Sequence, residues 1–188
     1  MAMPALLPRY TVDQVDELPE YPGVRYDVLD GLLLVSLSPG SAHAVVTSRI
    51  ISALVAGIPE EHAYVAAPGE LRLEPFTSLV PDVLVYPAKF GLGAAWKDIT
   101  EWLLAVEVVS PSSAVYDREY KRRAYLSLGV QEYWVVDPMQ RSIEVMRAVN
   151  EAPRVERRVF RYNVPGGTHG VSIDVPRVFR GVRGLIRV

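Results

Sequence analysis

Hydrophobic and polar positions predict alternating helices and strands in the first third of the 188-residue chain. Two strand-like runs, Val24–Leu29 and Leu32–Leu37, flank Asp30-Gly31, a pair that favours a two-residue hairpin turn. Apolar residues then recur at helical spacing from Ala42 to Gly57. A shorter helix is expected over residues 11–18, because the threonine at its start can accept a hydrogen bond from the first turn.

The most informative pattern is a nearly continuous apolar run from Trp102 to Val109, which Glu107 alone interrupts. Such a run is typical of a strand buried on both faces in the middle of a sheet. The spacing of apolar residues and the positions of Gly and Pro predict the remaining elements. They are strands at Ala63–Ala66, Glu70–Glu74, Asp82–Tyr86 and Glu132–Val136, a loop at Lys89–Ile99, a helix at Asp117–Leu128 closed by Gly129, a closing hairpin of Ser142–Ala148 and Val155–Tyr162, and a short final strand near Val178–Val188.

These elements indicate one mixed α/β domain over residues 1–188. The absence of cysteine excludes disulfides, a thiol nucleophile and thiolate metal ligands. No apolar run reaches the ~18 residues of a membrane span. The N-terminus also lacks the pattern of a secretory signal, a basic segment followed by an apolar one. We therefore expect a cytoplasmic protein that has no membrane partner.

Charge is distributed unevenly along the chain. Residues 1–140 contain 10 Lys and Arg against 18 Asp and Glu, whereas residues 141–188 contain 10 Arg against 4 acids. An arginine-rich segment can supply phosphate contacts to a nucleic acid. The alternative is that these arginines cover exposed strand faces. The general bias of the chain, 17 Arg against 3 Lys, favours that alternative.

Two carboxylates lie in apolar strand sequence. Burying Glu107 without a partner costs free energy, so a metal ion, a cation or a raised pKa must compensate it. Asp82 opens a second apolar strand, and if the two strands are neighbours, both carboxylates reach one point at a strand end. Two carboxylates with open positions for water and phosphate are typical of a magnesium site. The structural alternatives are an internal ion pair for Glu107 and a strand-start role for Asp82.

Lys121 is the third candidate. It lies one turn into the helix expected from Asp117, on the same face as Asp117 and Tyr125. The alternative is that Lys121 is a solvated member of the charge cluster over residues 118–123.

Several short motifs occur in an order and spacing that resemble the Uma-type restriction endonuclease family of the PD-(D/E)XK superfamily. The resemblance spans roughly residues 24–138. The motifs are Tyr26–Gly31, Ser38-Pro39 with His43, Pro81–Val83, Val106–Ser113, Asp117, Lys121, Tyr125, Gly129 and Glu132–Pro138.

The resemblance implies a restriction endonuclease-like core, with a central mixed sheet flanked by helices and extra strands at the N-terminal and C-terminal ends. It implies that Asp82 and Glu107 bind Mg²⁺ or Mn²⁺, and that the main-chain carbonyl of Val108 is a further metal ligand. The superfamily's lysine normally stands two residues after the second acid, at the position of Val109 here. Lys121 on the next helix matches the family's lysine instead. The expected catalytic residues are therefore Asp82, Glu107 and Lys121.

Three further residues are auxiliary candidates. Asp27 stands where the family usually has a glutamate, so its shorter side chain leaves a role in the metal shell open. His43 matches a family histidine, which either contacts a phosphate or the metal shell or serves the helix by capping or packing. Asp117 is interpreted as the N-cap of its helix in preference to a catalyst.

The resemblance implies metal-dependent hydrolysis of phosphodiester bonds in DNA. It also implies a homodimer, because cutting both strands usually calls for two active sites. One alternative is a non-catalytic DNA-binding or scaffold domain that retains the nuclease fold, although the presence of all three expected catalytic residues argues against it. The other is a metal-dependent hydrolase that acts on a different phosphate ester.

Overall fold

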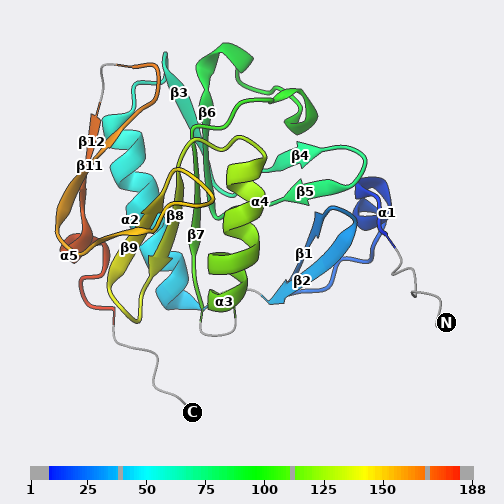
Figure 1. The fold of residues 1–188 in the computed structure, drawn as a ribbon, viewed down its shortest axis with the longest axis horizontal. Coiled ribbons are helices and arrows are strands. Elements are labelled where there is room, and N and C mark those ends of the chain that lie inside the picture. Colours follow the sequence, from blue (N-terminus) through cyan, green and yellow to red (C-terminus); the bar gives the residue numbers. More distant parts are fainter. Residues whose placement is uncertain (1–8, 38–39, 111–112, 168–169, 183–188) are drawn as a thin grey trace.

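The centre of the molecule is a six-stranded sheet (Figure 1). The computed structural model describes residues 9–37, 40–110, 113–167 and 170–182. Strands β7 and β8 are parallel and the other neighbours in this sheet are antiparallel, so the mixed sheet expected from the sequence is confirmed. In spatial order the strands are β10 (Arg154–Glu156), β9 (Ser142–Met146), β8 (Tyr133–Asp137), β7 (Leu104–Val108), β6 (Val83–Pro87) and β3 (Ala63–Ala66).

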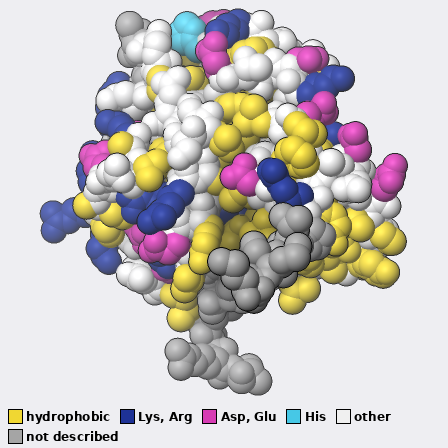
Figure 2. Space-filling view, turned by 45° about the vertical axis from the view of Figure 1, so that its right-hand side comes forward, with side chains coloured by type: hydrophobic (Ala, Val, Ile, Leu, Met, Phe, Trp, Pro, Cys, Tyr) yellow, Lys and Arg dark blue, Asp and Glu magenta, His cyan; other side chains and the backbone are white. Residues whose placement is uncertain are grey.

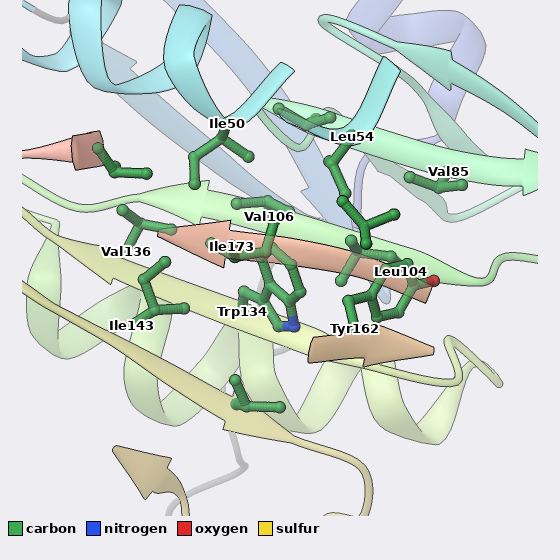
Figure 3. Packing of buried hydrophobic residues seen from close by; sticks show 14 of the residues in the cluster. Ile50, Leu54, Val85, Leu104, Val106, Trp134, Val136, Ile143, Tyr162 and Ile173 are labelled. Carbon is green, nitrogen blue, oxygen red and sulfur yellow. The ribbon is translucent and has the colours of Figure 1, made fainter. Parts of the chain in front are cut away.

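One face of this sheet packs against helix α2 (Ser41–Gly57) through an apolar cluster. Val46, Ile50 and Leu54 lie at helical spacing and are all fully buried. Figure 3 shows Ile50 and Leu54 pointing from α2 toward the side chains of β7. The predicted helix is therefore confirmed, although its N-cap is Gly40, which supplies no side-chain hydrogen bond.

The opposite face is covered by a helical segment in three parts: α3 (Ala114–Tyr116), a π-helical turn (Asp117–Lys121) and α4 (Arg122–Ser127). Because helices cover both faces, β7 can be apolar almost throughout, as the sequence predicted. Figure 1 shows α2 and α4 on opposite sides of the central strands. In the described part of the chain, no helix is long and apolar enough to cross a membrane.

The helical segment over β7 starts earlier than predicted. The prediction that Asp117 caps the helix is wrong, since Ser113 occupies the N-cap and Asp117 lies buried within the helical segment. The predicted stop at Gly129 is confirmed. The N–H of Gly129 bonds to Leu126 and that of Val130 to Tyr125, a Schellman closure in which glycine adopts a φ of 95°.

A second sheet forms at the N-terminal side, in the order β2-β1-β5-β4. The Asp30-Gly31 hairpin is confirmed, with positive φ at both turn residues. Thr11 caps α1 in a capping box with Gln14. The short strand β5 follows three turn residues and was not predicted. The elements are α1 (Val12–Asp16), β1 (Val24–Leu29), β2 (Leu32–Leu37), β4 (Leu71–Leu73) and β5 (Thr77–Leu79).

The C-terminal prediction is partly wrong. The closing hairpin is shorter than predicted, because only the three residues of β10 pair with β9 on this side before the chain leaves the sheet. Its continuation, β11 (Val159–Asn163), pairs with an unpredicted strand, β12 (Gly170–Asp174). Phe160 and Tyr162 of β11 are buried because they pack edge-on against Trp134 of the central sheet.

The predicted final strand is wrong where the structure describes it. Val175–Val178 is helix α5, residues 179–182 are turn and irregular chain, and residues 183–188 lie outside the described part. Pro176 cannot donate a ladder hydrogen bond and favours the first turn of a helix, while Asp174 caps that turn by accepting from Arg177 N–H. The predicted loop at Lys89–Ile99 contains two short 3₁₀ turns, Ala88–Phe90 and Trp96–Asp98.

Candidate active site

Asp82 and Glu107 meet at the end of two neighbouring strands, as their positions in the sequence suggested. Strands β6 and β7 are antiparallel, and Val83 pairs with Val106. One step further along both strands, Asp82 comes opposite Glu107, and opposite residues of an antiparallel pair project from the same face. That face is the one covered by α3 and α4, where Ala105 and Val109 pack with Tyr125.

Glu107 lies in the middle of the sheet and is only 2% exposed. Its Oε1 accepts hydrogen bonds from Lys121 Nζ at 2.8 Å and from Tyr125 OH at 2.9 Å. Burial raises the pKa of Glu107 to about 8, because the charges of Lys121 and Arg25 offset only part of the desolvation while Asp82 and Asp117 add to it. The carboxyl group of Glu107 thus accepts two hydrogen bonds, but the positive charges near it offset only part of the cost of its burial.

Asp82 is held from two directions. Its Oδ2 accepts from His43 Nε2 at 2.9 Å and from the main-chain N–H of Val108 at 2.8 Å. Burial alone would raise the pKa of Asp82, but the hydrogen bond and charge of His43 hold it below its ordinary value. The N–H and C=O of one strand residue point to the same side of the strand. The Val108 carbonyl is therefore directed toward the same side as Asp82.

Lys121 points inward from the π-helical turn and is 4% exposed, so the alternative of a solvated lysine is wrong. Besides Glu107, its Nζ lies 3.5 Å from Asp117 Oδ1 and 3.8 Å from Asp27 Oδ2. Burial opposes the charge, but these three carboxylates raise the pKa of Lys121 above its ordinary value. The ammonium is therefore charged at neutral pH. Val109 lies in the apolar cluster on the same face, as strand alternation predicts.

His43 and Asp27 attach two outlying elements to this cluster. His43 comes from the first turn of α2, where its Nδ1 is 3.3 Å from the hydroxyl of Thr47. Asp27 comes from β1 and accepts the main-chain N–H of Val80 at 2.9 Å. Asp27 is 2% exposed and so belongs to the buried part of the cluster.

Arg25 and Tyr125 are the residues that the sequence did not single out as candidates. Arg25 precedes Asp27 by two positions, and alternation along β1 places both side chains on one face. Its NH1 lies 3.6 Å from Asp82 Oδ1, and its Nε lies 3.9 Å from Asp27 Oδ2. The alternation of Arg25 with Asp27 and the helical spacing of Tyr125 from Lys121 are the signals that point to them.

The cluster is rich in negative charge. Four carboxyl groups face two permanent cations and His43, so full ionisation of the acids leaves an excess of two negative charges when His43 is neutral and of one when it is protonated. Among the described residues, no group of three or more His, Asp or Glu side chains is arranged as a metal site. The donors that suit Mg²⁺ are instead two carboxylates and one main-chain carbonyl. The charged members are Asp27, Asp82, Glu107, Asp117, Arg25 and Lys121.

Basic side chains do not form a continuous band on the face drawn in Figure 2. Lys and Arg are scattered among acidic and hydrophobic side chains there. Several arginines of the basic C-terminal region pair internally or with main-chain carbonyls, such as Arg147 with Glu132 and Arg141 with Phe179. The arginine excess of residues 141–188 is thus partly structural.

The Pro111-Ser112 part of the family motif lies outside the described residues.

Comparison with known proteins identifies the family and the fold. The sequence profile of the Uma2 family, described as "Putative restriction endonuclease", matches residues 12–183. The fold is similar to the crystal structure of a "putative nuclease belonging to DUF820" from Anabaena variabilis ATCC 29413. That similarity has a TM-score of 0.70 and 19% sequence identity, and it covers 90% of this chain and 97% of the other. No curated protein matches the sequence. The chain therefore belongs to the Uma2 family of restriction endonuclease-like proteins and has the fold of that group.

Proposed function

We propose that this protein is a metal-dependent endonuclease that hydrolyses phosphodiester bonds in DNA. The observation that supports the proposal most directly is the buried contact of Lys121 with Glu107 beside Asp82. A structural ion pair in a core needs one acid for each base. Here the acids outnumber the cations, which favours a site that receives further positive charge from a ligand.

Asp82, Glu107 and the Val108 carbonyl are the groups that would hold Mg²⁺ or Mn²⁺. Among the described residues, the charged partner of Asp82 Oδ1 is the Arg25 guanidinium at 3.6 Å, and the Lys121 and Tyr125 bonds occupy one oxygen of Glu107. One oxygen of each carboxylate is thus available to a metal. When bound, the ion would polarise the phosphate and lower the pKa of an attacking water.

In hydrolysis, a water oxygen bonds to phosphorus, one P–O ester bond breaks and the leaving alkoxide takes up a proton. Lys121 would stabilise the charge that grows on the phosphate oxygens, or orient the water, by donating from its ammonium. Because its pKa is raised, Lys121 is a poor general base. Tyr125 donates to Glu107 and so holds this carboxylate in place, which makes it a positioning residue.

We further propose that the protein acts as a homodimer, because cleavage of both strands of a duplex calls for two such sites. Strand β2 supports association, since it is the edge strand of the N-terminal sheet in the described chain. It carries no charged side chain, and Leu32, Val35 and Leu37 are 53%, 61% and 80% exposed. Uncharged, apolar edge strands favour pairing with another chain.

Metal binding is expected to stabilise the folded protein. A ligand at about 100 times its Kd adds about 2.7 kcal/mol to the free energy of unfolding. Mn²⁺ should raise the melting temperature of the wild type and not that of Asp82→Ala or Asp82→Asn, the second of which keeps the shape of the side chain. Asp98→Ala removes an exposed carboxylate and serves as the control. An equal response of Asp82→Asn and wild type would contradict the metal site.

The pH dependence of stability should report Glu107. Its pKa is about 8 in the folded protein against an ordinary 4.5, so between these values the folded protein binds this proton more tightly than the unfolded chain. In EDTA, the contribution of this group to the free energy of unfolding therefore decreases as the pH rises from about 5 to about 8.

Melting temperatures across this pH range should fall for the wild type relative to Glu107→Gln, which cannot titrate. The shift that Mn²⁺ produces should grow over the same range, because the ion binds the ionised carboxylate. Parallel pH profiles for wild type and Glu107→Gln would refute the prediction.

Cleavage assays should separate the proposed activity from its alternatives. The wild type with Mg²⁺ should cut plasmid or linear duplex DNA, and Lys121→Ala should be slower by about 10²- to 10³-fold, the usual effect of losing one charge-stabilising donor. Lys97→Ala, which removes an exposed lysine, should cut like the wild type. Cleavage that survives Lys121→Ala unchanged would remove this lysine from the mechanism.

Binding without cleavage would favour a DNA-binding or scaffold role. Hydrolysis of small phosphate esters alone would favour a different hydrolase.

Charges on β2 should disrupt the dimer. Val35→Lys and Leu37→Lys place like charges on the edge strand, and both positions are exposed enough to accept lysine without unfolding. Sedimentation velocity should show a dimeric wild type and a monomeric double variant, and the variant should nick plasmid instead of linearising it. A wild type that sediments as a monomer and still linearises plasmid would rule out this requirement.

A further inference from the structure

Arg25 differs from the other arginines that are partly buried in acidic surroundings. Arg72 is 16% exposed and donates hydrogen bonds to three carboxylates, and Arg118 is 24% exposed and donates to two. The Arg25 side chain is 33% exposed, yet its guanidinium makes no hydrogen bond to another described residue. Its Nε is buried and has no hydrogen-bond partner. A buried donor without an acceptor is costly, so this arrangement is unusual for a purely structural arginine.

Charge explains why the guanidinium remains in this place. It lies 3.6 Å from Asp82 and 3.9 Å from Asp27, which are ion-pair distances but too long for hydrogen bonds. The nearer contact is with Asp82 Oδ1, the oxygen that the His43 and Val108 bonds leave free. Arg25 therefore stands beside the oxygen proposed to bind the metal, with its donors uncommitted and its side chain 33% exposed.

We propose that Arg25 is a phosphate-binding residue of this site, which donates to the non-bridging oxygens of a DNA phosphodiester held between the metal and the guanidinium. The proposal rests on the proposed function and adds the contact that holds the substrate. A guanidinium offers five donors in a planar fork that matches two oxygens of a phosphate, and lysine lacks this geometry. The phosphate would supply the hydrogen-bond acceptors that Arg25 lacks in the free protein. Its negative charge would also offset the repulsion between the guanidinium and the metal ion.

The position of Arg25 also connects the N-terminal sheet to the reaction. Arg25 and Asp27 lie on one face of β1, and Asp27 is tied to the main chain at Val80, in the link between β5 and β6 that leads to Asp82. The hairpin is thereby held against the end of the strands that carry the two proposed metal ligands. A DNA strand that places its phosphate at Asp82 and Glu107 would thus also face β1.

The test measures DNA binding without cleavage. A short fluorescein-labelled duplex is titrated with wild type, Arg25→Gln and Arg25→Lys in Ca²⁺ buffer, by fluorescence anisotropy at several salt concentrations. Losing one phosphate contact should reduce the slope of log K against log salt by about 0.9. Arg25→Gln should show this change and bind about 10- to 100-fold more weakly, the range for a hydrogen bond to a charged group. Arg25→Lys should retain the slope while binding more weakly than the wild type.

Arg158→Gln is the matched control, because Arg158 is an exposed arginine in the link between β10 and β11, across β9 and β8 from the site. It should leave affinity and slope unchanged. Melting temperatures of all variants identify any that fail to fold, and Arg25→Met serves as a second neutral variant if Arg25→Gln is unstable. An Arg25 that only balances charge would alter the melting temperature and leave the salt slope as in the wild type, and that result would overturn the proposal.

The two proposals can fail separately. If the wild type cleaves DNA and Arg25→Gln retains both affinity and slope, the assignment of Arg25 is wrong and the nuclease proposal stands. If the wild type binds DNA with the Arg25-dependent slope and never cleaves it, the binding assignment stands and the catalytic proposal fails. A wild type that binds no DNA overturns both.

Discussion

The architecture of this protein depends on one carboxylate in the middle of its sheet. Glu107 interrupts the apolar strand β7 at a point where both faces are covered, which leaves it only 2% exposed. Its two donors, Lys121 and Tyr125, both come from the helical segment packed over that face. The π-helical turn brings Lys121 inward, and the Schellman closure at Gly129 ends the helix just after Tyr125. The burial of one carboxyl group thus constrains a strand and the helical segment packed over it.

The two faces of the sheet have different tasks. The face under α2 is filled by aliphatic and aromatic side chains and supplies hydrophobic stabilisation. The opposite face has a similar apolar cluster, but its end holds the acidic site. Because His43 lies in the first turn of α2, at the same end of the sheet, α2 still reaches the site through Asp82. The apolar packing of α2 therefore holds one polar contact in position.

Electrostatics joins segments that are far apart in the sequence. Arg25 and Asp27 come from the N-terminal sheet, Asp82 and Glu107 from the central sheet, and Lys121 from the helix that follows. The carboxylates exceed the cations, so the site favours a cationic ligand and disfavours further acid. We propose that a metal ion offsets this excess through the carboxylates, and that a phosphate then binds between the ion and the cations Arg25 and Lys121.

The sequence by itself determined the main strands, helix α1, the hairpin of β1 and β2, and the need of Glu107 for a compensating partner. These follow from local rules: apolar spacing, the turn preference of Asp30-Gly31, and the cost of burying a carboxylate. Only the tertiary structure decided that Asp117 lies inside a helix, that β11 leaves the sheet to pair with β12, and that Arg25 reaches Asp82. Each of these depends on contacts between residues distant in the chain. Local preference cannot encode them, because burial and charge act only once the segments have come together.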